Sequence, residues 1–191
     1  MNDFPHDVPE LVAKGQAIAD EAGFLLSCEP RTGGLLRTLA ATKPGGRILE
    51  VGAGVGVGTA WLLAGMDDQA TMVTLEIDEE AADIVRGLFA GEPQVEVVHV
   101  DATTWLAAYD GPPFDLVFVD TTVTKFDRRD LLVKCMRPGA ILVGDDLIPG
   151  PTWTAQHPAR VNRFLAEIVR DPELVVTLVG WASGLVVAAR R

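Results

Sequence analysis

The residues from Glu50 to Thr59, E-V-G-A-G-V-G-V-G-T, alternate glycine with other residues in a way that suits ligand binding. They follow the apolar stretch 47–51 and precede a segment typical of a helix. Glycines at such a turn allow a sharp change of chain direction and let a ligand approach backbone N–H groups. A tight turn without a ligand is the alternative, but four alternate glycines are more than a turn requires. The segment therefore predicts a ligand-binding loop.

The spacing of these glycines excludes two common nucleotide-binding motifs. A dinucleotide fingerprint needs G-x-G-x-x-G, and its third glycine would fall at Val57 or at Thr59 in the two frames that the segment offers. A phosphate-binding P-loop ends in G-K-[ST], whereas Gly58 is followed directly by Thr59. We therefore expect neither NAD binding nor a P-loop.

Acidic residues follow each of the next apolar stretches. A carboxylate at such a place can accept two hydrogen bonds from a vicinal diol, and an Asp-Ala pair after a strand can equally cap a helix. The acids are Glu76 in VTLEID, Asp101 before Ala102, Asp120 after FDLVFV, and the pair Asp145-Asp146 after AILVG.

The acids Asp120, Asp145 and Asp146 would lie together if their two strands are adjacent and parallel, because neighbouring strands are about 5 Å apart. Like charges at that distance repel unless they are protonated or matched by a cation. A hard divalent cation such as Mg²⁺ prefers oxygen ligands of this kind. The alternative is that the three aspartates cap loops and form turns in a protein without a metal.

Strand-like and helix-like segments alternate along the chain. Short apolar stretches predict strands at 47–51, 71–77, 95–100, 114–119 and 140–144, and a closing hairpin at 173–179 and 184–189. Helices are expected at 9–22, 32–42, 57–66, 79–90, 102–108, 127–137 and 158–170. The pattern predicts an α/β fold, doubly wound around a mostly parallel seven-stranded sheet with a C-terminal antiparallel hairpin. Ligands of such sheets bind beyond the carboxyl ends of the strands.

The composition limits the class of protein and its partners. The chain has 191 residues, 48% hydrophobic and 23% charged, which is typical of one globular domain. The net charge of -11, with no basic patch, argues against nucleic acid or an anionic membrane as partner. No apolar run approaches the roughly 20 residues of a membrane helix, and the first residues do not resemble a signal segment. We expect a cytoplasmic protein with a single domain over 1–191, divided into a helical extension (1–45) and a cofactor-binding core (46–191).

The glycine loop, followed in order by Glu76 and by Asp101-Ala102, resembles motif I and the later landmarks of the class I S-adenosylmethionine-dependent methyltransferases. The resemblance implies their Rossmann-like fold and S-adenosylmethionine (SAM) as cofactor, with the loop on its amino-acid part and ribose. It further implies Glu76 on the ribose hydroxyls and Asp101-Ala102 at the adenine. The cofactor-binding residues that it implies are Glu50, Gly52, Ala53, Gly54, Gly56, Gly58, Thr59, Glu76, Ile77, Asp101, Ala102 and Asp120.

The later acids make the sequence similar to one group within that family, the small cation-dependent O-methyltransferases that include the catechol and caffeoyl-CoA enzymes. The resemblance covers about residues 25–190 and implies a divalent cation, Mg²⁺ or another, on Asp120, Asp145 and Asp146. The family has an asparagine at the place of Asp146, and a catalytic lysine at the place of Val123. Lys125 lies nearby, so Asp120 and Lys125 are the candidate catalytic residues.

The expected function is transfer of a methyl group from SAM to a hydroxyl oxygen of a small molecule. Two alternatives stay open: a metal-free methyltransferase acting on nitrogen, oxygen or a carboxylate, and a cofactor-binding module without catalysis. The proline-rich loop 149–160, with Trp153 and His157, is placed where a substrate lid would lie. A homodimer is expected because the helix 9–22 would otherwise have little to pack on.

Overall fold

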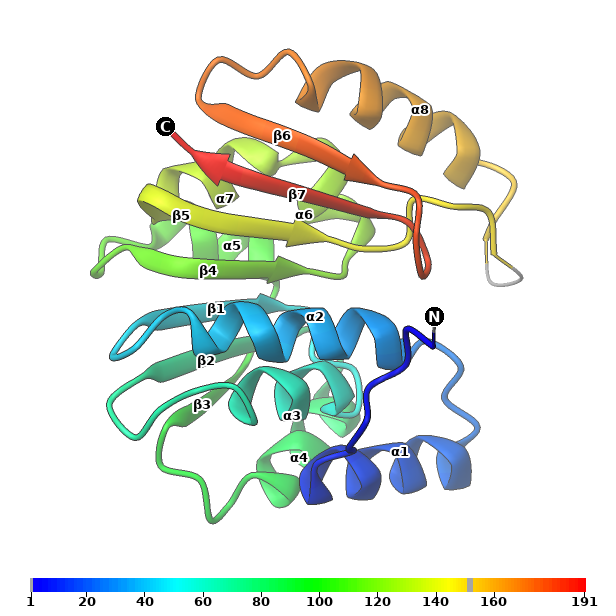
Figure 1. Ribbon diagram of the computed structural model, residues 1–191, viewed down its shortest axis with the longest axis vertical. Helices are drawn as coiled ribbons and strands as arrows, with labels where there is room; N and C mark the ends of the chain where they lie inside the picture. The colour runs from blue at the N-terminus through cyan, green and yellow to red at the C-terminus, as the bar shows by residue number, and fades with distance from the viewer. Residues whose placement is uncertain (1, 151–152) are drawn as a thin grey trace.

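The strands form one seven-stranded sheet with helices on both faces, in a computed structural model that describes residues 2–150 and 153–191 (Figure 1). The strand order is β3-β2-β1-β4-β5-β7-β6. Strands β1 to β5 pair in parallel, and β7 runs antiparallel to both β5 and β6. The strands are β1 (Arg47–Val51), β2 (Thr71–Glu76), β3 (Val95–His99), β4 (Phe114–Val119), β5 (Met136–Gly144), β6 (Leu174–Val179) and β7 (Leu185–Arg190). The predicted fold class and the antiparallel hairpin are confirmed.

The buried strands point alternate side chains into two separate cores. On one face, residues such as Ile48 pack with α1, α2, α3 and α4; on the other, residues such as Leu49 pack with α5, α6, α7 and α8. The helices are α1 (Glu10–Ala22), α2 (Pro30–Ala41), α3 (Val57–Leu63), α4 (Glu79–Leu88), α5 (Ala102–Ala108), α6 (Thr122–Asp127), α7 (Arg129–Cys135) and α8 (His157–Ile168). Because successive strand residues face opposite ways, strands that are apolar throughout are covered on both faces.

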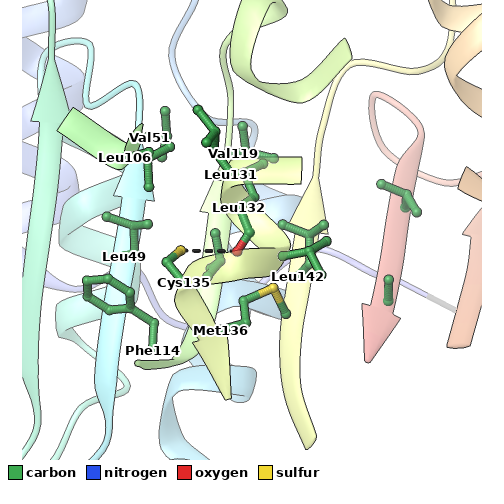
Figure 2. Close-up of a cluster of buried hydrophobic side chains, with 14 of the residues drawn as sticks. Leu49, Val51, Leu106, Phe114, Val119, Leu131, Leu132, Cys135, Met136 and Leu142 are labelled. Carbon is green, nitrogen blue, oxygen red and sulfur yellow. Dashed lines mark hydrogen bonds between the residues drawn. The ribbon is translucent and has the colours of Figure 1, made fainter. Parts of the chain in front are cut away.

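Cys135 belongs to the second of these cores. Figure 2 shows it among Leu49, Phe114, Leu132 and Met136, with its Sγ donating a hydrogen bond to the Leu132 oxygen at 3.0 Å. Burial raises the pKa of its thiol to about 12. The thiol is therefore a packing group of the core.

The N-terminal helices pack directly on the sheet's first helical layer. Helix α1 buries Val12 and Ala19 and contacts α3 and α4, while α2 packs on α3. The contact of α2 is tight, since a Cβ added to Gly33 would lie 2.2 Å from the Trp61 ring. Helix α1 therefore has a packing partner, contrary to the expectation from the sequence, and the homodimer stays a prediction.

The segment between β4 and β5 differs most from the sequence prediction. A loop and one helix over 127–137 were expected, but the chain forms α6 and α7, and β5 begins at Met136 instead of residue 140. Residues 137–139 at the start of β5 are exposed, so the apolar pattern marks only the buried part of the strand. Within the described residues, no helix has both the length and the apolar character that crossing a bilayer requires. Residues 151 and 152 of the predicted lid loop lie outside the described residues.

Candidate active site

A cavity of about 480 Å³ opens beyond the carboxyl ends of β1, β2 and β4. This is where the strand order reverses, because the chain proceeds from β1 to β2 on one side and to β4 on the other. The glycine loop forms one wall. Gly52 has a φ of +96°, and a Cβ there would lie 2.7 Å from Thr121 Cγ2, so the turn requires glycine. The walls include Glu50, Gly52, Ala53, Gly54, Val55, Gly58, Glu76, Asp78, Ile84, Asp120, Thr121 and parts of the segment 22–28.

Glu50 is a fully buried carboxylate at the wall of this cavity. Its Oε2 accepts hydrogen bonds from the hydroxyls of Thr59 and Thr74, whereas its Oε1 is buried without a partner among the described residues. Chiefly because of burial, the pKa of Glu50 is raised to about 7; the nearby charges of Asp120 and Glu76 act in the same direction, against the two threonine hydrogen bonds. A buried oxygen without a partner is costly. An N–H donor from a bound molecule would satisfy the Oε1 atom.

Glu76 joins the glycine loop to the end of β2. Its Oε2 accepts a hydrogen bond from the Gly54 N–H at 2.8 Å, and its Oε1 accepts from the N–H groups of Ile77 and Asp78 at 2.8 and 3.0 Å. A carboxylate has about four acceptor sites, so the backbone uses three and leaves room for one ligand hydroxyl. Ile77 is 65% exposed beside it and presents an apolar side chain to the surface.

The remaining predicted cofactor residues support the loop or lie apart from the cavity. Asp101 caps α5, because its Oδ1 accepts hydrogen bonds from the Thr104 N–H at 2.7 Å and the Thr104 hydroxyl at 2.9 Å. These bonds lower the pKa of Asp101. Asp101 and Ala102 are not among the cavity-lining residues, so the helix-cap alternative describes their contacts, and the adenine role stays a prediction. Gly56 turns the chain into α3 at a φ of +91°.

A second cavity, of about 840 Å³, adjoins the first. Its walls come from the loop before α2, from α6, from the end of β5, from the proline-rich loop and from the β6–β7 turn. Three residues line both cavities: Leu26, Ser27 and Asp120. Of these, Asp120 alone carries an ionisable side chain. Burial raises its pKa to about 7, while the charge of Lys125 acts in the opposite direction.

Helix α6 places Lys125 in the second cavity. Its side chain is only 2% exposed, and its Nζ donates a hydrogen bond to the backbone oxygen of Asp145. Val123, which occupies the position of the family's lysine, is 51% exposed. The structure therefore brings Lys125 to the candidate site. Burial lowers the pKa of Lys125, against the charges of Asp120, Asp145 and Asp146, which raise it.

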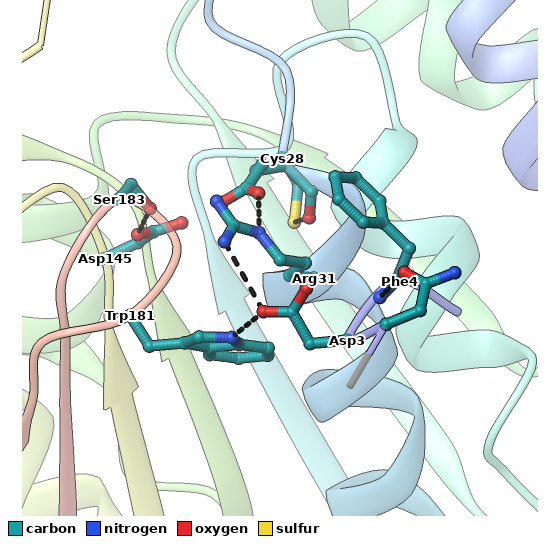
Figure 3. Close-up of polar contacts among 9 residues, drawn as sticks. Asp3, Phe4, Cys28, Arg31, Asp145, Trp181 and Ser183 are labelled. Carbon is teal, nitrogen blue, oxygen red and sulfur yellow. Dashed lines mark hydrogen bonds and ion pairs between the residues drawn. The ribbon is translucent and has the colours of Figure 1, made fainter.

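Two of the three predicted ligands of a divalent cation each hold one carboxylate oxygen in hydrogen bonds. Asp145 Oδ1 accepts hydrogen bonds from the Asp146 N–H at 2.6 Å and from the Ser183 hydroxyl (Figure 3). Asp146 Oδ1 accepts from Trp153 Nε1 at 2.7 Å. Over residues 2–150 and 153–191, no three histidine, cysteine or acidic side chains are arranged to hold a metal ion. As they lie, these residues do not fit the predicted cation.

The N-terminal segment contacts the β6–β7 turn, part of which lines the second cavity, and this contact has no clear signal in the sequence. Figure 3 shows the Asp3 carboxylate between Trp181 Nε1, at 2.6 Å, and Arg31 Nη1, at 3.5 Å. Trp181 lies in the β6–β7 turn, two residues before the cavity-lining Ser183. The segment thus connects this turn to α2. Partners 178 residues apart leave no local pattern by which to predict the contact.

Comparisons with known proteins give a consistent assignment. Residues 49–147 match a family model described as a methyltransferase domain. A protein of Mycobacterium ulcerans named "Putative O-methyltransferase" is 30% identical over 84% of this chain and 76% of its own length. Another of that name from Mycobacterium avium is 27% identical over 97% of this chain and 94% of its own length.

Solved structures extend the likeness to the three-dimensional fold. The cofactor-bound protein Rv0187 from MTB has a TM-score of 0.86 and 28% identity, covering 96% of this chain and 91% of that protein. The O-methyltransferase from Bacillus cereus in complex with SAH has a TM-score of 0.84 and 23% identity, covering 97% and 93%. The likeness in fold therefore spans nearly the whole chain, including α1 and α2.

Proposed function

This chain belongs to the methyltransferase domain family, and we propose that it transfers the methyl group of SAM to a hydroxyl oxygen of a small molecule. The first cavity is the proposed cofactor site, and the second is the proposed acceptor site. The observation that carries the proposal is that the two cavities meet at Asp120. A methyl group at that junction would face an acceptor in the second cavity.

The first cavity suits SAM in three respects. The glycine loop exposes backbone to the ligand, Glu50 Oε1 offers an acceptor to its ammonium group, and Glu76 retains one acceptor site for a ribose hydroxyl. The sulfonium charge of SAM is also favoured beside Glu50, Glu76 and Asp120. Rv0187, which is 28% identical, was solved with a cofactor bound. In this account Gly52, Ala53, Gly54 and Gly58 contact the cofactor, Gly56 and Thr59 position the loop, and Ile77, Asp101 and Ala102 lie toward the adenine.

The transfer is a single displacement at the methyl carbon. The acceptor oxygen forms a bond to that carbon while the carbon–sulfur bond breaks, and the bonding electron pair passes to sulfur to leave S-adenosylhomocysteine (SAH). The hydroxyl proton must leave the acceptor, and the Asp120 carboxylate lies at the junction to receive it. The protein contributes chiefly by holding oxygen, carbon and sulfur in line.

The experiment is a transfer assay with isotopically labelled SAM and a panel of phenols, catechols and alcohols, with amines and carboxylic acids for comparison. The proposal predicts label in an ether product and one SAH for each methyl transferred. Label found only on an amine or a carboxylate would favour the metal-free alternative, in which the acceptor is a nitrogen or a carboxylate group. Binding of SAH without turnover on any acceptor would favour the module without catalysis.

A further inference from the structure

Lys125 is a buried cation in a group of carboxylates, and its burial needs an explanation. Lysine is almost never fully buried unless it is paired, yet this side chain is 2% exposed. Its hydrogen bond goes to the backbone oxygen of Asp145, at the carboxyl end of β5. An ammonium has three N–H donors. Among the described residues this bond uses one, so two remain for a ligand in the second cavity, which Lys125 lines.

The charges around Lys125 are those that were predicted to bind a metal. The carboxylates of Asp120, Asp145 and Asp146 all act electrostatically on its ammonium. Among the described residues that line this cavity, the other lysine or arginine is Arg160, which is paired with Asp127 on α6. Lys125 is therefore the cation that balances the acids at the ends of β4 and β5.

The hydrogen bonds of the acids agree with an ammonium in this role. Asp145 directs Oδ1 to Ser183 and to the Asp146 N–H, while Asp146 directs Oδ1 to Trp153. A divalent cation on these carboxylates would repel the buried ammonium. Neutralisation by Lys125 involves no such repulsion.

We propose that the Lys125 ammonium takes the place of a divalent cation in this site. It balances the strand-end carboxylates and donates a hydrogen bond to the acceptor oxygen as that oxygen loses its proton, so methyl transfer proceeds without a metal. The inference rests on the proposed function for its catalytic part. Its statement about metal binding does not depend on turnover.

The first test titrates Mn²⁺ into the wild-type protein after it has been freed of metal and saturated with SAH. Calorimetry and electron paramagnetic resonance detect the binding. We expect no saturable binding at millimolar Mn²⁺. A saturable site of one Mn²⁺ per chain would overturn the inference. This measurement needs no known acceptor, so a failure of the proposed function does not affect it.

The second test uses variants in the transfer assay. Lys125→Met keeps the length of the side chain without its charge, and we expect kcat to fall about 100-fold, as for loss of one donor to a developing oxyanion, with the Kd of SAH unchanged. Lys134→Met, which removes an exposed lysine of α7, is the matched control and should retain full activity. Retention of kcat by Lys125→Met would contradict the inference.

The third test is chelation of the wild-type enzyme. Activity should survive exhaustive chelation and should not respond to added Mg²⁺. Loss of activity on chelation with recovery on Mg²⁺ would overturn the inference and restore the metal site predicted from the sequence. If Lys125→Met fails to fold, the Mn²⁺ titration and the chelation experiment still decide the question.

Discussion

The Nζ atom of Lys125 donates a hydrogen bond to the backbone oxygen of Asp145, 20 residues further along the chain. This contact joins α6 to the end of β5 and places an ammonium beside two strand ends that each carry an aspartate. The position of the cation therefore depends on a helix that no sequence pattern predicted. The same helix leaves Val123 exposed.

Glu76→Ala should weaken SAH binding by about 1–3 kcal/mol, the cost of losing hydrogen bonds to a charged group. The variant loses the ligand contact and also the hydrogen bond that holds Gly54 in the loop. Calorimetric titration with SAH measures the change. Glu79→Ala, at an exposed residue of α4 that does not line the cavity, is the control. An unchanged Kd for Glu76→Ala would place the ribose contact elsewhere.

Gly52→Ala should lower the free energy of unfolding by about 1–3 kcal/mol, because its φ of +96° is strained for alanine and its Cβ would lie 2.7 Å from Thr121. SAH binding should weaken as well, since the displaced backbone forms the cavity wall. The matched control is Gly87→Ala in α4, where a Cβ meets nothing within 4 Å. That variant should gain about 0.5–1 kcal/mol. Equal stability of the two variants in urea unfolding would refute the account of the loop.

Glu50 should make the protein less stable as the pH rises. Burial raises its pKa from 4.5 to about 7, so the folded state retains a proton that the unfolded chain releases over this interval. The contribution of Glu50 to the free energy of unfolding is therefore largest below pH 4.5 and declines as the pH rises toward 7. The contribution is about 3 kcal/mol by the conversion from pKa to free energy.

Glu50→Gln cannot ionise and should lose less stability than the wild type between these two pH values. Urea unfolding of both proteins across the interval measures the difference. The same decline in both proteins would show that Glu50 does not titrate there.

Trp181→Phe should raise the KM of the acceptor and leave the Kd of SAH unchanged. The change removes the hydrogen bond to Asp3 and so loosens the β6–β7 turn. That turn holds Ser183, whose hydroxyl donates a hydrogen bond to Asp145. Because Asp3 is exposed, solvent screens this contact, and we expect only a small effect. Asp3→Asn tests the same contact from the other side. A change in the Kd of SAH with an unchanged KM of the acceptor would show that the contact supports the first cavity and not the second.

The sheet and the glycine loop could be predicted from the sequence because their signals are local. Largely apolar stretches mark β1 to β4, and a run of alternating glycines marks the turn after β1. Helix α6 could not be predicted, because its segment is rich in threonine and valine, which favour helices weakly. The hydrogen bonds of Asp145 and Asp146 could not be predicted either. Their partners Ser183 and Trp153 lie 38 and 7 residues away, and only the fold brings them together.

The most direct test of the account is Asp120→Asn, because Asp120 is the ionisable residue that both cavities share. With an acceptor identified by the labelled-methyl assay, kcat and the Kd of SAH are measured for the variant and the wild type. The account predicts a fall in kcat of about 100-fold or more, as for loss of a general base, with little change in the Kd of SAH. An unchanged kcat would show that the methyl group is not transferred at the junction of the two cavities.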